Sequence, residues 1–263
     1  MLESIISFLE SIGITKAAEQ VNFIFNPVNI PFAIWETLYA PLVATVLAYV
    51  IGLPLGVLLV TGEETGIRPM KKGFMTALNT IINLLRSIPF LILMVMVFPL
   101  SRLILGTSIG TMATIVPLTV AAAPYVARLV ESSLREMDHG VVEAAQSMGC
   151  STWQIVTKVM LPECLPGLIN GATNATITIL SYGAMAGNIG GGGLGAISLM
   201  RGHGRNQRLV LYVAVIILVI LVQIIQSIGT ALCVKTDKRI NQNFKYQFRY
   251  FKFSFHVRST SLV

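Results

Sequence analysis

The residues of this chain that could carry chemistry include a glycine-rich segment near position 190. Gly190, Gly192 and Gly195 satisfy the GxGxxG pattern that binds the pyrophosphate of dinucleotides. That pattern requires a preceding strand and an acidic residue about 20 positions further on. Here an apolar segment precedes the glycines, and no acidic residue follows at that distance. We therefore interpret the segment as an irregular loop in which glycine allows close backbone approach.

Other reactive patterns are also missing from the sequence. The chain contains no GxxxxGK[ST] segment, so it cannot hydrolyse ATP by the P-loop mechanism. The three histidines lack metal-ligand spacing, and the three cysteines form no CxxC pair. The sequence therefore predicts a protein that is not an enzyme by itself and that has no catalytic residues, no bound cofactor and no metal.

One polar stretch, residues 138–162, lies between long apolar segments and carries closely spaced helix-ending signals. Asp138 is suited to cap a helix, and Gly149 is suited to end it. Ser151 followed by Gln154 fits a capping box, so a second short helix is expected to start there. The stretch is therefore predicted to form two short helices that meet at a sharp angle.

The two short helices have faces that differ in character. The second helix has an apolar face made of Ile155, Val156, Val159 and Met160. Pro162 and Pro166 prevent it from continuing into the next apolar segment, because proline removes a backbone donor and clashes with the preceding turn. In the first helix, Ala144 and Ala145 keep one flank thin enough to enter a groove on a partner.

The composition indicates a membrane protein. Of 263 residues, 54% are hydrophobic and 12% are charged, whereas a soluble domain carries about 25% charged residues. The net positive charge is local, since from Lys235 onward seven basic residues accompany one acidic residue. We interpret this excess as a cytoplasmic anchor and do not expect nucleic-acid binding.

Long runs with few or no charged residues predict five transmembrane helices, each long enough for a span of about 20 residues. These helices cover residues 36–61, 74–99, 108–133, 166–187 and 209–233. Residues 1–34 are predicted to be an interfacial N-terminal segment, and 35–235 a membrane domain. The basic, aromatic segment 236–263 either lies on an anionic membrane face or is an appendage without a role.

The predicted spans contain many residues that disrupt helices. Prolines occur at positions 41, 54, 89, 99, 117 and 124, and glycines at 52, 56, 171, 183 and 187. We attribute most of them to helix packing, because small residues let backbones approach closely in lipid. Arg86, inside the second span, is expected to reach the cytoplasmic interface or to pair with protein groups, since an unpaired charge in the membrane is costly.

The loop charges predict the orientation of the chain. With the N-terminus outside, thirteen basic residues fall on the inside and five on the outside. The C-terminus and residues 138–162 are then cytoplasmic. This arrangement places Arg201, Arg205 and Arg208 outside. It is there contrary to the positive-inside rule, by which basic residues favour the cytoplasmic side.

The polar stretch resembles the EAA loop of ABC-importer permeases. Its spacing is Glu143-Ala144-Ala145, three residues, Gly149, nine residues, Val159, one residue and Leu161-Pro162. Valine stands at position 159 where isoleucine is usual. Further segments are similar to the methionine-importer subgroup, namely residues 86–90, 106–110, 116–119, 160–163, 181–187 and 191–195. The resemblance runs from about residue 35 to residue 235.

The resemblance implies an all-α type I ABC importer permease with a cytoplasmic coupling-helix loop, in a bacterial cell membrane. The implied partners are a second copy of this chain, two copies of a separate ATPase that binds ATP, an extracytoplasmic solute-binding lipoprotein and membrane lipid. In that family the loop occupies a cleft of the ATPase. Carried over onto this chain, the coupling residues are Glu143, Ala144, Ala145, Gly149, Val159, Leu161 and Pro162.

The substrate pathway is expected near the dimer axis, beside the fourth predicted span. Tyr182, Met185 and Asn188 are the candidates, and Met185 could contact a thioether through its polarizable sulfur. Methionine, in the L or D form, is implied by the subgroup resemblance and not by these residues. An importer of another small amino acid or of a dipeptide remains an alternative.

Two functions of other classes are less well supported by the sequence. An ion-coupled secondary carrier usually has ionisable residues inside the membrane, but residues 164–200 and 209–234 contain no acidic residue. A membrane scaffold or assembly protein is the other alternative. Co-purification of an ATPase distinguishes these functions from an ATP-driven importer.

Overall fold

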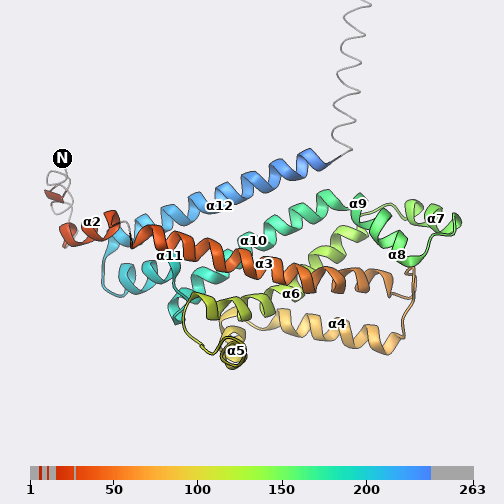
Figure 1. The fold of residues 1–263 in the computed structure, drawn as a ribbon, viewed down its shortest axis with the longest axis horizontal. Coiled ribbons are helices and arrows are strands. Elements are labelled where there is room, and N and C mark those ends of the chain that lie inside the picture. The colour runs from red at the N-terminus through yellow and green to blue at the C-terminus, as the bar shows by residue number, and fades with distance from the viewer. Residues whose placement is uncertain (1–5, 8–10, 12–15, 27, 238–263) are drawn as a thin grey trace, which may run out of the picture.

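The computed structural model describes residues 6–7, 11, 16–26 and 28–237, and in these residues the regular elements are helices (Figure 1). Four long helices lie beside one another, and shorter elements connect them at both ends. They are α3 (Ile30–Thr61), α6 (Thr111–Arg135), α10 (Leu165–Ala186) and α12 (Arg208–Thr236). Almost all of the predicted C-terminal tail, and most of the first 15 residues, lie outside the described residues.

Small residues bring α3 and α6 close together. A small residue recurs at every fourth position of α3, and these residues are buried: Ala40, Ala44, Ala48, Gly52 and Gly56. A Cβ atom on Gly56 would lie 2.6 Å from the carbonyl oxygen of Ala127, and one on Gly52 would lie 2.8 Å from that of Ala123. Because glycine lacks this atom, the two backbones approach closely, as the sequence predicted.

The second predicted span is not one helix. Residues 74–99 divide into α4 (Lys72–Ser87) and α5 (Phe90–Leu105), which meet at an angle of 108°. Ile88 and Pro89 between them have extended backbone conformations. The prediction of a continuous helix is wrong here because proline disfavours helical geometry in the residue before it and cannot donate the hydrogen bond that would continue the helix.

The other prolines in the predicted spans do not interrupt their helices. Pro41 and Pro54 lie inside α3, Pro99 lies inside α5, and Pro117 and Pro124 lie inside α6. Membrane helices tolerate such residues when neighbouring groups satisfy the freed carbonyls. A proline therefore marks a possible break, and tertiary packing decides where the break occurs.

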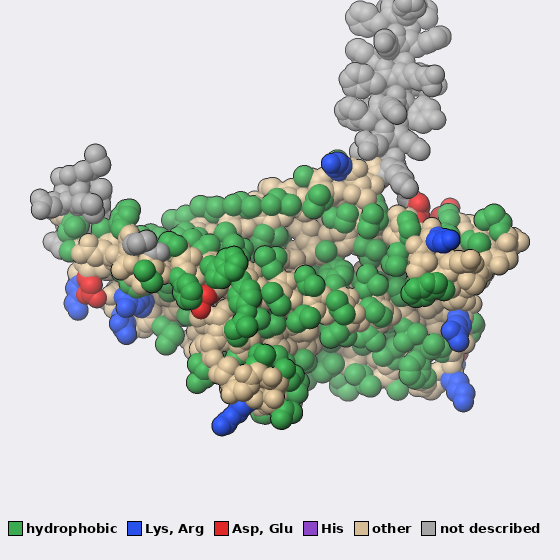
Figure 2. Space-filling view, in the orientation of Figure 1, with side chains coloured by type: hydrophobic (Ala, Val, Ile, Leu, Met, Phe, Trp, Pro, Cys, Tyr) green, Lys and Arg blue, Asp and Glu red, His purple; other side chains and the backbone are tan. Residues whose placement is uncertain are grey.

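Three described helices are individually long and apolar enough to cross a membrane, namely α3, α6 and α12. The bent pair α4–α5 makes a fourth if it is one span. The first predicted span lies within α3, which begins six residues earlier, inside the predicted N-terminal segment. The fourth predicted span corresponds to α10, a helix of 22 residues. Figure 2 shows apolar side chains over the middle of the molecule and most of the charged ones toward its ends.

The main apolar core joins the long helices to the EAA turn, a name we use for residues 138–163. Leu118, Val126 and Ile179 are fully buried along α6 and α10. The same cluster continues through Leu134 and Met137 to residues of the turn. The turn is therefore packed onto the end of the bundle rather than extended away from it.

A short helix fixes the other end of the molecule. Residues Ala17–Phe25 form α2, in which Gln20 is buried and its side-chain oxygen accepts a hydrogen bond from the backbone N–H of Leu209 at the start of α12. The guanidinium of Arg201 lies 4.0 Å from the centre of the Phe23 ring. One of the three arginines that oppose the positive-inside rule is thus held by a cation–π contact.

Candidate functional site

The first helix of the EAA turn is α7 (His139–Ser147), and its start is capped as predicted. The carboxylate of Asp138 accepts a hydrogen bond of 2.9 Å from the backbone N–H of Gly140. The preceding helix α6 ends at Arg135, so two residues separate it from the cap. The connection between α6 and α7 is therefore very short.

The helix ends at Gly149, also as predicted. Gly149 has a φ of +76°, a conformation that glycine adopts without a steric penalty. Its N–H donates to the carbonyl of Gln146 at 2.9 Å, and the N–H of Cys150 donates to that of Ala145 at 3.2 Å. This pair of bonds is the Schellman motif, which satisfies the last carbonyls of the helix and reverses the chain.

The second half of the turn begins with the predicted capping box. The N–H of Gln154 donates to Ser151 Oγ at 3.4 Å, and the N–H of Ser151 donates to Gln154 Oε1 at 2.8 Å. Helical structure then runs through α8 (Thr152–Ile155), a π-helical segment η1 (Val156–Met160) and α9 (Leu161–Glu163). A bend at Cys164 separates it from α10, as the prolines predicted.

The predicted coupling residues divide into two groups. Those that are exposed and available to a partner are Glu143, Ala144, Gly149 and Pro162. Those that face the protein core are Ala145, Val159 and Leu161. Ala145 is only 2% exposed, so its small side chain serves packing against the rest of the turn, whereas Ala144 leaves the flank of α7 thin.

Two exposed apolar residues of the turn were not among the predicted site residues. Met148 is 77% exposed and Trp153 is 75% exposed, one on each side of the reversal at Gly149. Large apolar side chains at such exposure mark surfaces that associate with other molecules. Trp153 was visible in the sequence as the single aromatic residue within residues 138–162.

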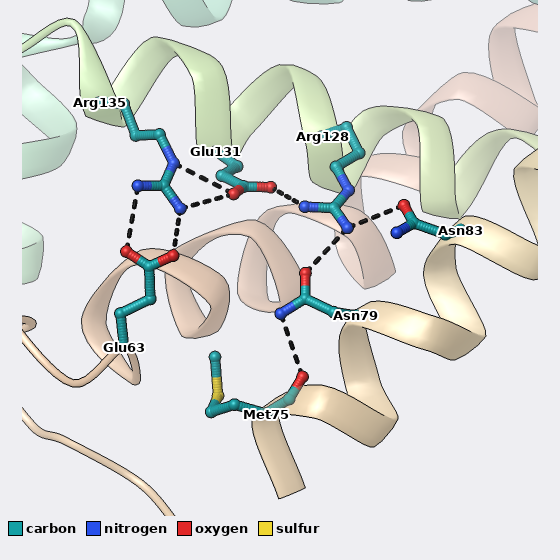
Figure 3. A network of polar contacts seen from close by, with 7 residues as sticks. All are labelled: Glu63, Met75, Asn79, Asn83, Arg128, Glu131 and Arg135. Atoms are coloured by element: carbon teal, nitrogen blue, oxygen red, sulfur yellow. Dashed lines mark hydrogen bonds and ion pairs between the residues drawn. The ribbon is translucent and has the colours of Figure 1, made fainter. Parts of the chain in front are cut away.

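Behind the turn, α6 carries a chain of charged groups (Figure 3). The buried carboxylate of Glu131 accepts hydrogen bonds from Arg128 Nη1 at 2.6 Å and from Arg135 Nη2 at 2.8 Å. Arg135 also donates two hydrogen bonds to Glu63, in the loop after α3. Arg128 and Arg135 are among the thirteen basic residues assigned to the inside from the sequence, but their partners 45 to 72 residues away could not be seen there.

The candidate substrate residues do not share one cavity. Tyr182 stacks on Phe90 of α5, with ring centres 4.4 Å apart. Met185 lines a largely apolar cavity of about 480 Å³ between α10, the segment after it, and α12. Asn188 is exposed on the short 3₁₀ turn η2 (Gly187–Ile189). The structure of this single chain therefore places the three residues on different surfaces.

The glycine-rich segment forms the irregular loop that the sequence predicted. Gly190, Gly192 and Gly193 have φ values of +96°, +75° and +73°. It leads into α11 (Gly193–Ala196) and the π-helical segment η3 (Ile197–His203). A Cβ atom on Gly191 would lie 2.8 Å from the carbonyl group of Ala186, so the loop packs tightly on the end of α10.

A carboxylate of α3, that of Glu36, holds this loop. Glu36 accepts hydrogen bonds from Thr111 Oγ1 at 2.6 Å and from the N–H of Gly193 at 2.8 Å. The N–H of Leu194 donates to Thr37 Oγ1 at 2.8 Å. These bonds connect the starts of α3, α6 and α11 at the end of the molecule opposite the EAA turn.

Comparison with known proteins agrees with this architecture. Residues 52–235 match the family described as "Binding-protein-dependent transport system inner membrane component". The chain is 48% identical over 210 residues to the "Probable D-methionine transport system permease protein MetI" of Vibrio cholerae, covering 79% of this chain and 92% of that protein. Its identity to the protein of the same name from Haemophilus influenzae is 46% over 208 residues, covering 79% and 97%.

Solved structures also show similarity to ABC transporter permeases. A structure described as "Inward facing conformations of the MetNI methionine ABC transporter" superposes with a TM-score of 0.77 at 44% identity, covering 80% of this chain and 96% of that chain. An amino acid ABC transporter matches with a TM-score of 0.63 at 16% identity, which supports the fold alone. The fold is that of a type I ABC importer permease. The chain belongs to the family of binding-protein-dependent transport system inner membrane components.

Proposed function

We propose that this chain is the permease subunit of an ATP-driven importer of methionine, in the L or D form or both. The observation that carries the proposal is the 48% identity to a methionine transport permease across nearly all of that protein's length. The EAA turn, with its two caps and its exposed tip, supports the importer class independently of the substrate.

The energy for transport comes from a separate ATPase that binds ATP and contacts the EAA turn. The exposed residues Glu143, Ala144, Gly149 and Pro162 form the contact surface, and Met148 and Trp153 extend it. Ala145, Val159 and Leu161 support that surface from behind. When ATP draws two such ATPases together, the turn moves with them, and its short connection to α6 carries the movement into the membrane.

Two copies of this chain enclose the pathway, and a solute-binding lipoprotein delivers the substrate from outside. The N-terminus lies outside and the C-terminus lies in the cytoplasm, as the distribution of basic residues favours. Transport requires that nucleotide and substrate stabilise different states of the dimer, since only such a difference couples the two. Tyr182, Met185 and Asn188 meet the substrate in some of these states.

The test is uptake of labelled methionine by cells or proteoliposomes that contain this chain with its partner ATPase and binding protein. We expect uptake that stops when ATP is depleted, and an ATPase that co-purifies with a tagged chain. Uptake of another amino acid or dipeptide, with no competition by methionine, would contradict the substrate. Uptake that survives ATP depletion, with no ATPase bound, would contradict the importer class in favour of an ion-coupled carrier.

A further inference from the structure

The polar chain behind the EAA turn extends onto α4. Arg128 Nη2 donates hydrogen bonds to Asn79 Oδ1 at 2.8 Å and to Asn83 Oδ1 at 2.9 Å. Both asparagines lie on α4, so one guanidinium reaches two side chains that are one helical turn apart (Figure 3). The Nδ2 group of Asn79 donates to the Met75 carbonyl at 3.0 Å, which orients its oxygen toward Arg128.

The charge of Arg128 ties this contact to the rest of the network. Its guanidinium pairs with Glu131, and its Nε atom is buried without a hydrogen-bond partner among the described residues. A partly buried cation depends on its remaining partners, because leaving it unpaired costs more than the pair itself contributes. The two asparagine oxygens are therefore needed to satisfy Arg128, and they hold α4 in register with α6.

Apolar contacts alone give α4 little anchoring. Met75 and Ile82 are the buried residues of this helix, and they pack in a small cluster with Leu59 and Ala127. Phe74, Ile81 and Leu84 of the same helix are exposed. Apolar packing of this extent is non-directional and would allow α4 to slide, whereas hydrogen bonds from a planar guanidinium fix a position.

We propose, on the basis of the importer function above, that Arg128, Asn79 and Asn83 are positioning residues that make α4 move together with α6 when the EAA turn is displaced. The bend at Pro89 then passes the movement to α5. Glu131, Arg135 and Glu63 complete the assembly by connecting the same guanidinium to the loop after α3. We call Arg128, Asn79 and Asn83 the α4 clamp.

The first test replaces both asparagines by leucine, which is similar in size but accepts no hydrogen bond. The purified permease–ATPase complex with its binding protein is assayed for basal and substrate-stimulated ATP hydrolysis. We expect basal hydrolysis to be unchanged and the stimulated-to-basal ratio to fall by about tenfold or more, because one hydrogen bond to a charged group is already worth about that factor in an equilibrium and this variant loses two. Asn83→Asp, which keeps an acceptor for Arg128, should retain the ratio.

A matched control lies on the same helix. Thr80 is exposed on α4 and its hydroxyl donates to the carbonyl of Thr76, so Thr80→Val should behave as the unmodified protein does. If the double leucine variant keeps the normal ratio while the complex is intact, the α4 clamp is not needed. If the unmodified complex itself shows no stimulation by substrate, it is the proposed importer function that fails.

The second test measures whether α4 and α6 move as one body. Spin labels at the exposed residues Ala77 of α4 and Ser132 of α6, in a background without native cysteines, report one distance between the helices. We expect that distance to be the same with and without trapped ATP in the unmodified clamp and to depend on ATP in the double leucine variant. An ATP-dependent distance in the unmodified clamp would overturn the proposal.

Discussion

At the scale of single residues, Gly149 has the strictest backbone requirement in the EAA turn. Its φ of +76° is outside the range of proline, and its N–H donates to Gln146. Gly149→Pro should therefore break the reversal between α7 and α8 and reduce substrate-stimulated ATPase activity by about tenfold or more, since a loss of 1.4 kcal/mol already gives that factor. The measurement is ATP hydrolysis by the reconstituted complex with and without substrate and binding protein.

Gly149→Ala separates backbone strain from crowding. A Cβ atom at this position would meet nothing within 4 Å, so the remaining cost is the left-handed conformation, about 1 kcal/mol. Gly73→Ala serves as the control, because that glycine has an ordinary conformation and equally open surroundings. Membrane insertion should be normal in all three variants. If Gly149→Pro kept normal substrate-stimulated ATPase activity, the turn would not be the site through which the ATPase moves the permease.

Met148 and Trp153 give a second prediction at this scale. Because both side chains are exposed, Met148→Ser and Trp153→Ser should leave the permease folded. Each should weaken binding of the ATPase by roughly tenfold, because a few large side chains carry most of the binding energy of a protein interface. The measurement is the affinity of the detergent-purified permease for the ATPase. Ile109→Ser, which removes an equally exposed side chain at the other end of the molecule, should have no effect.

Much of the EAA turn could be predicted because its signals are local. Asp138, Gly149 and the pair Ser151–Gln154 each act within four residues along the chain, and all are found in their predicted roles. The burial of Ala145 could not be predicted in this way. Ala144 and Ala145 are equivalent by residue type, and packing against the end of the bundle decides which of them is exposed.

At the scale of elements, the packing of α3 on α6 depends on the glycines of α3. A valine at position 56 would place its Cβ 2.6 Å from both the Ala127 carbonyl oxygen and the Val130 Cβ. Gly56→Val should lower the stability of the permease by about 1–3 kcal/mol, the usual cost of overpacking. Thermal unfolding in detergent measures the effect. As a control, Ile51→Val lies on the exposed face of the same helix and should change the midpoint of thermal unfolding little. Equal unfolding midpoints for the two variants would contradict close packing of α3 on α6 at Gly56.

The elements also show where prediction from sequence stops. Six prolines looked alike in the sequence, yet only Pro89 ends a helix among those in the predicted spans. The charge-free run from residue 87 to residue 101 gave no sign of the bend. Hydropathy reports how apolar a segment is and not the direction of the helix axes within it. Likewise, the spacing of residues 128, 131 and 135 predicts ion pairs within α6, but nothing local predicts that Asn79 and Asn83 complete them.

At the scale of the whole molecule, directional polar contacts concentrate at its two ends. Glu36 connects three helix starts at one end, and Glu131 with its arginine partners connects α6, α4 and the loop after α3 at the other. Between them the helices meet mainly through small and apolar side chains, which pack the backbones closely together. The helix ends are therefore positioned by directional polar bonds, and the middle of the bundle is held by close apolar packing.

The orientation of this arrangement in the membrane can be tested with two exposed positions at opposite ends. In a variant without native cysteines, Met148→Cys places a thiol in the EAA turn, and His203→Cys places one at the end of η3. With thirteen basic residues assigned to the inside and five to the outside, the positive-inside rule predicts that the turn is cytoplasmic. A membrane-impermeant maleimide should therefore label His203→Cys in intact cells and Met148→Cys only after permeabilisation. The reverse pattern would put the EAA turn outside, out of reach of any cytoplasmic ATPase, and would contradict both the topology and the importer mechanism that depends on it.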